Sequence, residues 1–219
     1  MSNKFVHTFA LTKLLNNLVK QKMATTKKDD ATEELIKNTA KRLFFGEGKF
    51  NATTQEIADA AGVNRTLINY YFRSRDKLFE LVFTDAQERE QERTESIIFS
   101  ELPFKAKIAE FIDDTFEMAK EYPYMEMYLV TQFNQGCYFK DEEGMDRMLK
   151  KFYEEFEVAM EEGLIQKMDP IQFILNMVSM TSFPIAMRPL FQKTMHLSDE
   201  EYEKILSDRK DIIMNTLFI

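Results

Sequence analysis

The chain has 219 residues, of which 44% are hydrophobic, so it can bury a core and is not a disordered protein. Its single cysteine, Cys137, rules out an intrachain disulfide and favours a reducing, cytoplasmic location. No apolar run reaches the roughly 18 residues that a membrane span needs. His7, His196 and Cys137 form no catalytic or metal-ligating pattern, and no glycine-rich phosphate loop is present. We therefore expect no enzyme, no metal site, no cofactor and no membrane partner.

The net charge of −8 is unevenly distributed along the chain. Residues 1–22 carry +4, residues 23–82 carry +1, and residues 83–219 carry −13. A near-neutral front can bind nucleic acid through a local basic patch while the acidic part faces away from phosphate. The overall charge therefore does not exclude DNA binding.

Residues 1–30 are predicted to be an N-terminal extension and linker. Apolar residues recur at helical spacing from Phe5 to Leu18, but Lys13 interrupts them and no small-residue cleavage site follows, which argues against a secretory signal. Two interpretations stay open: an additional amphipathic helix, or a natural start at Met23.

Residues 31–82 are predicted to form a three-helix helix-turn-helix domain. Helices are expected over about 35–45, 54–61 and 64–72. Thr53 and Glu56 have the spacing of a capping box, and Gly62 suits the tight turn between the two short helices. Ser74 can cap a fourth helix that runs to about residue 100.

The second short helix carries a polar arc suited to DNA. On a helical wheel, Arg65, Thr66, Asn69 and Tyr70 lie on one side and the apolar residues on the other. These side chains suit phosphates, base edges and thymine methyl groups. Arg73 and Arg75 follow at the start of the next helix, where free amides add attraction for phosphate. A merely solvated polar face is the alternative interpretation.

The run from Thr53 to Leu78 resembles the N-terminal domain of the TetR (tetracycline-repressor-like) family. Ile57-Ala58, Ala61-Gly62-Val63 and Tyr71-Phe72 followed by Ser74 fall at the family's positions without a gap. The resemblance covers about residues 32–82 and implies a DNA-binding transcriptional regulator.

The resemblance also implies a set of DNA contacts from the second helix, the recognition helix and the start of the fourth helix. The expected DNA-binding residues are Thr53, Gln55, Asn64, Arg65, Thr66, Asn69, Tyr70, Tyr71 and Arg75. Two of them depart from the family pattern: Asn69 stands where Tyr is usual and Thr66 where Gly is common. Both lie on the polar arc, so both are expected to alter base preference.

Residues 83–219 are predicted to form a larger, all-helical domain for ligand binding and dimerisation, which makes the whole chain all-α. Beyond the fourth helix, the pattern predicts helices over about 103–122, 124–135, 145–162, 169–183 and 199–218. The family's last two long helices form a four-helix bundle across a two-fold axis. The matching apolar stripes here are Ile171, Ile174, Leu175, Val178 and Ile205, Ile212, Ile213, Leu217.

A homodimer is expected because two recognition helices are needed to read two half-sites of a palindromic operator in double-stranded DNA. For any single residue of the stripes, packing against its own core is the simpler interpretation.

Methionine and phenylalanine are abundant in the larger domain and suit an adaptable pocket for an apolar effector. The pocket is expected to include Met118, Met125, Phe133, Phe152, Met177 and Met180, although such residues are more often plain core. Arg188, between two prolines, is placed to hold a ligand carboxylate. The sequence thus favours a repressor released from its operator by a small apolar or amphipathic ligand. The alternative is a ligand-independent DNA-binding protein controlled by a protein partner.

Overall fold

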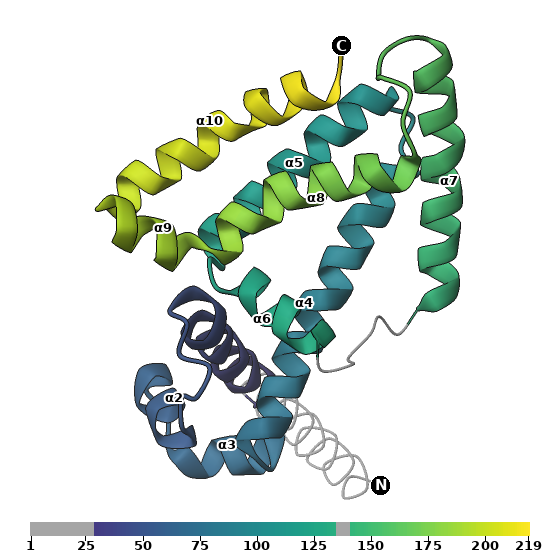
Figure 1. The fold of residues 1–219 in the computed structure, drawn as a ribbon. Helices are drawn as coiled ribbons and strands as arrows, with labels where there is room; N and C mark the ends of the chain where they lie inside the picture. Colours follow the sequence, from purple (N-terminus) through teal and green to yellow (C-terminus); the bar gives the residue numbers. More distant parts are fainter. Residues whose placement is uncertain (1–28, 135–140) are drawn as a thin grey trace, which may run out of the picture. The chain divides into compact units, whose positions relative to one another are not determined.

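The computed structural model describes residues 29–134 and 141–219, and every regular element within them is a helix (Figure 1). The chain divides into two compact units. Within the described residues, the first comprises 29–41 and 52–82, and the second comprises 42–51 and 83–219. The chain therefore passes between the units at three points, after Lys41, after Asn51 and after Val82. The expected extension over residues 1–30 lies almost wholly outside the described residues.

The first unit contains a helix over residues 29–41, α2 (Thr54–Ala61), α3 (Arg65–Phe72) and the first two turns of α4 (Arg75–Ile98). Helices α2 and α3 pack against each other. Their apolar sides meet in a core in which the following side chains are buried: Ile36, Ala40, Ile57, Ala58, Ile68, Phe72, Leu78 and Phe79.

The predicted capping signals of this unit are confirmed. The Thr53 hydroxyl accepts a hydrogen bond from the Glu56 amide, and the Glu56 carboxylate accepts one from the Thr53 amide. Gly62 adopts a left-handed backbone with φ 66°, and its amide donates to carbonyls of the last turn of α2. The Ser74 hydroxyl accepts a hydrogen bond from the Lys77 amide at 3.1 Å and so caps α4. Local hydrogen bonding therefore sets where these helices begin and end.

The second unit contains one short π-helix and six α-helices besides the rest of α4. They are η1 (Arg42–Gly46), α5 (Phe104–Glu121), α6 (Met125–Asn134), α7 (Glu142–Glu161), α8 (Pro170–Ala186), α9 (Arg188–Met195) and α10 (Asp199–Leu217). Helix α5 packs against α7, α8 and α10, while α6 packs against α8 and η1. The bands of α5, α8 and α10 run beside one another in Figure 1.

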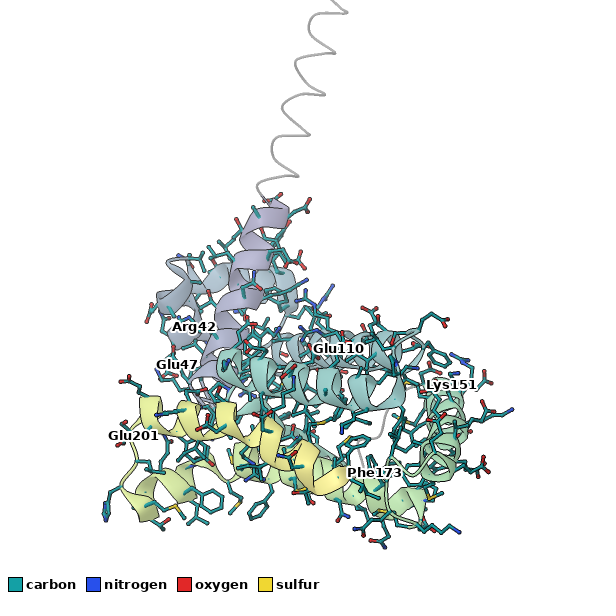
Figure 2. The ribbon with its side chains drawn as sticks, turned by 90° about the horizontal axis from the view of Figure 1, so that it is seen from above. Arg42, Glu47, Glu110, Lys151, Phe173 and Glu201 are labelled. Atoms are coloured by element: carbon teal, nitrogen blue, oxygen red, sulfur yellow. The ribbon has the colours of Figure 1, made fainter. Side chains whose placement is uncertain are left out.

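Aromatic side chains dominate the core of the second unit. Phe173, labelled in Figure 2, is fully buried on α8. Its ring centroid lies 5.2 Å from that of Phe156 on α7 and 5.9 Å from those of Phe104 and Phe218. Pairs at these separations add attraction beyond the area that they bury. Many of the chain's phenylalanine side chains therefore pack in this core.

The segment 42–51 is anchored on α6 by aromatic contacts within the second unit. The Phe50 ring stacks on Tyr128 at 5.3 Å, and Phe83 meets Tyr128 edge-on at 4.9 Å. The Tyr124 amide donates to the Phe45 carbonyl at 3.0 Å. Gly48 has φ 68°, a conformation that favours glycine, and a Cβ there would lie 3.0 Å from the Tyr124 ring, so a side chain would require that ring to shift.

Helix α9 was not predicted, because Pro184 and Pro189 each indicate the end of a helix in the sequence. Pro189 instead lies in the first turn of α9, where a missing amide hydrogen costs nothing. Pro184 lies inside the last turn of α8, where it cannot donate to the carbonyl of Met180. Arg209 of α10 replaces that donor: its Nε and Nη2 lie 3.2 and 2.9 Å from the Met180 oxygen. The proline is therefore tolerated because a neighbouring helix satisfies the orphaned carbonyl.

Of the described helices, none is by itself long and apolar enough to cross a membrane, although α8 and α9, bent by 63° at their junction, pass that test as a pair on length and composition.

Candidate functional site

Helix α3 presents a polar, exposed face opposite a buried apolar one. Arg65, Asn69 and Tyr70 are exposed, with Tyr70 exposing 73% of its surface. Ile68 and Phe72, on the other side, hold the helix against the core of the first unit. One side of α3 is therefore fixed by packing, and the other carries a cation, an amide and a phenol toward solvent. These groups can contact phosphates and base edges.

Asn64 and Thr66 are engaged with each other at the start of α3. The Asn64 amide oxygen accepts hydrogen bonds from the Thr66 backbone amide at 2.9 Å and from the Thr66 hydroxyl at 2.7 Å. Asn64 is thus the N-cap of the helix. Its oxygen is committed to that cap, so the side-chain NH₂ group is the part that can donate to a phosphate or base acceptor.

Thr53 and Gln55 make contacts within α2. The Thr53 hydroxyl donates to the Glu56 carboxylate at 2.8 Å, as part of the capping box. The Gln55 amide donates to Asp59 at 2.7 Å, one helical turn away, and its side chain is exposed. A DNA contact by Gln55 must compete with this intrahelical bond, whereas Thr53 acts first as a structural cap.

The two tyrosines at the end of α3 have different surroundings. Tyr71 is half-buried, and its hydroxyl donates to Asp29 at 3.4 Å. Burial, followed by the nearby Asp29 carboxylate, raises the pKa of Tyr71. Tyr70 packs edge-on against the Tyr71 ring at 5.0 Å and projects outward. The arrangement makes Tyr70 the phenol available to a phosphate and Tyr71 its support.

Arg75 takes part in the architecture of the first unit. Its Nε donates to the Ala52 carbonyl at 3.3 Å, its Nη1 lies 3.2 Å from Asp76, and its guanidinium lies 4.9 Å from the Phe79 ring centroid. Each of these contacts limits how far the side chain can reach toward DNA.

The sequence placed Arg73 beside the predicted phosphate-binding helix start, but the family resemblance did not include it among the expected DNA contacts. It is exposed, and its backbone is left-handed with φ 65°, which is unfavourable for any residue with a Cβ. Only one other described non-glycine residue, His196, has a positive φ. An exposed cation directly after α3 can contact phosphate, and strained backbone is often retained where it serves a function. Sequence spacing brought Arg73 to notice, but its conformation is visible only in the structure.

A cavity of about 340 Å³ lies within the second unit. It is lined by side chains of α4, α5, α7 and α8, and most of them are apolar. The apolar lining includes Ile98, Ile108, Phe111, Met148, Phe152 and Met177. Its volume is at the lower end of the range for small-molecule sites, and its soft side chains suit an apolar ligand.

The six residues expected to form a pocket do not lie together. Phe152 and Met177 line the cavity. Met118 and Met125 are not among its lining residues, and Met180 lines a second hollow of about 500 Å³ beside α9 and α10. The side chain of Phe133 lies outside the described residues.

The suggestion that Arg188 holds a ligand carboxylate is not supported, because its guanidinium group already forms ion pairs with acidic side chains of the protein. Arg188 is buried, its Nη1 lies 2.5 Å from Glu203, and its Nη2 lies 3.2 Å from Asp199. Its guanidinium also lies 5.5 Å from the Tyr202 ring centroid. The Tyr202 hydroxyl donates in turn to the Pro184 carbonyl at 2.7 Å. This network joins α8, α9 and α10.

Two ionisable side chains line the cavity, Glu90 of α4 and Lys107 of α5. Burial, with a smaller effect of the Asp114 charge, raises the pKa of Glu90 to about 7. Lys107 exposes only 2% of its surface, and its ammonium group lies 2.8 Å from the Glu155 carboxylate. Sequence reasoning missed Glu90, because neighbouring glutamates on α4 are exposed and its burial depends on the packing of other helices. Within the described part of the chain, no group of three or more metal-ligating side chains is present.

Residues 36–82 match the family described as bacterial regulatory proteins, tetR family. No curated protein matches the chain. Three solved structures illustrate its likeness in fold. A TetR-family transcriptional regulator from Haemophilus influenzae is 17% identical, with 87% of this chain and 98% of that chain covered and a TM-score of 0.52. HlyIIR, a hemolysin II transcriptional regulator, is 20% identical, with 87% and 99% covered and a TM-score of 0.53.

The third structure is AibR, solved in complex with isovaleryl coenzyme A and operator DNA. It is 15% identical, with 85% of this chain and 98% of that chain covered and a TM-score of 0.58. The expected all-α fold, with an N-terminal helix-turn-helix domain and a larger helical domain, is confirmed.

Proposed function

We propose that this chain, which belongs to the TetR family by its DNA-binding domain, is a dimeric repressor that a small ligand releases from its operator. Regulators of this family bind DNA and control transcription. The observation that carries the proposal is the exposed polar face of α3 on a fully packed helix-turn-helix. In this proposal α3 enters the major groove and reads bases through Arg65, Thr66 and Asn69.

Phosphate contacts in the proposal come from residues around α3. Tyr70 is the most exposed aromatic side chain of the helix, and Arg73 adds a cation directly after it. Gln55 and the Asn64 amide group add neutral donors from the two helix starts. Such contacts orient a protein on DNA without reading its sequence.

Dimerisation is proposed through an apolar face on α8 and α10, two helices that pack side by side. The exposed side chains of this face are Ile171, Leu175, Val178, Phe183, Ile205 and Ile212. Ile171, Leu175 and Val178 fall at helical spacing on α8, and Ile205 and Ile212 do so on α10. An apolar face of this kind is typical of a surface that a second copy covers. Ile174, Ile213 and Leu217 of the predicted stripes pack instead into the core of their own unit.

Ligand release is proposed to act through α4. Residues 75–82 of this helix belong to the first unit, and residues 83–98 belong to the second. Glu90, Gln91, Thr94 and Ile98 of α4 line the cavity, so a ligand there contacts the helix that leads back to the DNA-binding unit. A ligand that binds the DNA-incompetent state more tightly shifts the equilibrium; about 1–3 kcal/mol of coupling is typical. The cavity supports this reading over control by a protein partner.

The experiment is to identify the sites that the protein occupies in its genome by footprinting, and then to measure binding to such a site in solution. The full chain should sediment as a dimer and bind a palindrome whose half-sites are about 34–36 Å apart or a multiple of it. Hydrophobic metabolites are then screened for release of the protein from that site. A monomeric protein, or one without preferred sites, would contradict the proposal.

A further inference from the structure

Glu90 is the acidic member of an otherwise largely apolar cavity lining. One of its carboxylate oxygens, Oε2, is buried, and no described residue donates a hydrogen bond to it. A buried carboxylate oxygen without a donor is costly, because it has lost water and gained no partner. A ligand that brings a donor to the Glu90 carboxyl group lowers that cost.

The cavity's basic residue is already neutralised by the protein. The Lys107 ammonium group donates to the Ile98 carbonyl at 2.7 Å and to the two Glu155 carboxylate oxygens at 2.8 and 3.0 Å. These three acceptors match the three hydrogens of the ammonium group. Lys107 therefore has no donor left for a ligand anion, whereas the buried Oε2 of Glu90 receives no hydrogen bond from any described residue.

Further acidic groups from two other helices lie near Glu90. Asp114 of α5 and Glu126 of α6 both disfavour its ionisation, whereas Arg93 of α4 favours it. Arg93 is itself paired with Asp114 at 3.0 Å, so that its charge is largely compensated. The local field therefore opposes a second negative charge and attracts a positive one.

We propose that Glu90 makes this cavity selective for lipophilic cations, namely molecules with an apolar body and one protonated amine. The amine donates to Glu90, and the apolar body lies along Ile108, Phe111, Met148 and Phe152 of the lining. This inference rests on the proposed function, which makes the cavity the effector site, and adds the chemical class of the effector. The same charges disfavour carboxylic acids and acyl thioesters of anionic carriers.

The test uses the full chain and three probes with the same ten-carbon tail: decylamine, decanol and decanoate. Calorimetry measures the affinity of each at pH 7.5, below its micelle concentration. Decylamine should bind at least tenfold more tightly than the other two, because a hydrogen bond to a charged group contributes about 1.5–3 kcal/mol. Glu90→Gln should abolish that preference and leave decanol binding unchanged within about twofold.

Two further variants complete the experiment. Glu92→Gln removes an exposed carboxylate from the same helix and should keep the preference for decylamine. Leu149→Phe adds volume to the lining and should weaken all tail-bearing probes together. Equal binding of the three probes, a preference that survives Glu90→Gln, or no binding at all would overturn the cation selectivity.

The proposed function is tested separately, by titrating operator DNA with the same protein in the presence of each probe. Release of DNA by decanol or decanoate at concentrations no higher than those needed for decylamine would keep a ligand-controlled repressor while rejecting the cation. Failure to bind any preferred DNA site would reject the repressor itself, whatever the probes do.

Discussion

The Arg75 side chain ties the start of α4 to the residue before the α2 cap, because its Nε donates a hydrogen bond to the Ala52 carbonyl at 3.3 Å. Ala52 is buried, so this carbonyl has little alternative access to water. The same guanidinium packs over the Phe79 ring. A residue at a family DNA-contact position thus also helps to hold the helix-turn-helix together.

Arg75→Ala is therefore expected to lower the free energy of unfolding by about 1 kcal/mol, through the lost hydrogen bond and cation–π contact. DNA affinity should fall for all sequences alike. Urea denaturation of the full chain measures the first effect and filter binding the second. Arg75→Lys keeps the charge without the planar group, and should recover part of the DNA affinity but little of the stability. A fully stable Arg75→Ala variant would contradict this assignment.

Arg73→Gly should weaken DNA binding without lowering stability, in contrast to Arg75→Ala. Glycine accepts the φ of 65° without a steric cost, so stability should stay equal or rise by up to about 1 kcal/mol. The loss of one phosphate contact should lower the slope of log K against log salt by about one unit. His196→Gly, at the other left-handed position, should show the stability effect with no change in the salt slope. An unchanged slope for Arg73→Gly would exclude the phosphate contact.

Arg65→Ala, Thr66→Ala and Asn69→Ala should each change which bases are preferred, and Tyr70→Phe should not. A lost bidentate base contact costs about 1–3 kcal/mol at one position of the site, whereas a lost phosphate contact weakens all sites. Selection from a random DNA pool measures the preferences of each variant. Identical selected sequences for the three alanine variants would show that the exposed face of α3 does not read bases.

Leu175→Asp should convert the protein to a monomer. Leu175 lies within the apolar face of α8 and α10 and exposes 55% of its surface, so a charge there is tolerated in the monomer but not in a covered interface. Sedimentation velocity measures the change. Val158→Asp is the matched control, since Val158 on α7 is 52% exposed and lies outside that face. A dimer that survives Leu175→Asp would place the interface elsewhere.

Glu90 should make stability depend on pH in a way that Glu90→Gln removes. The pKa of Glu90 rises from 4.5 to about 7 in the folded protein, so the folded state holds this proton more tightly than the unfolded one. The associated stability is fully present below pH 4.5 and is lost as the pH rises through 7. The free energy of unfolding of Glu90→Gln should therefore match that of the wild type at pH 4.5 and exceed it at pH 8, by on the order of 3 kcal/mol.

Asp114, Arg93 and Glu126 remain in both proteins, so the difference in the free energy of unfolding reports on Glu90. Equal differences at the two pH values would show that this carboxyl is not desolvated.

The sequence by itself determined the elements whose signals are local. The capping box of Thr53 and Glu56, the left-handed turn at Gly62 and the Ser74 cap depend on residues two to four positions apart, so their spacing was enough to predict them. The polar face of α3 followed from its period in the same way. The family resemblance over the same residues is the basis for proposing that this face contacts DNA.

The tertiary structure alone decided the features that depend on residues far apart in the chain. Helix α8 continues through Pro184 because Arg209 of α10 satisfies the Met180 carbonyl, and Arg188 is closed to ligands because Asp199 and Glu203 pair with it. Glu90 differs from the exposed Glu92 only in the helices packed against it, and this packing raises its pKa. Hydrogen-bond partners and desolvation come from the whole three-dimensional neighbourhood, which spacing along one segment does not encode.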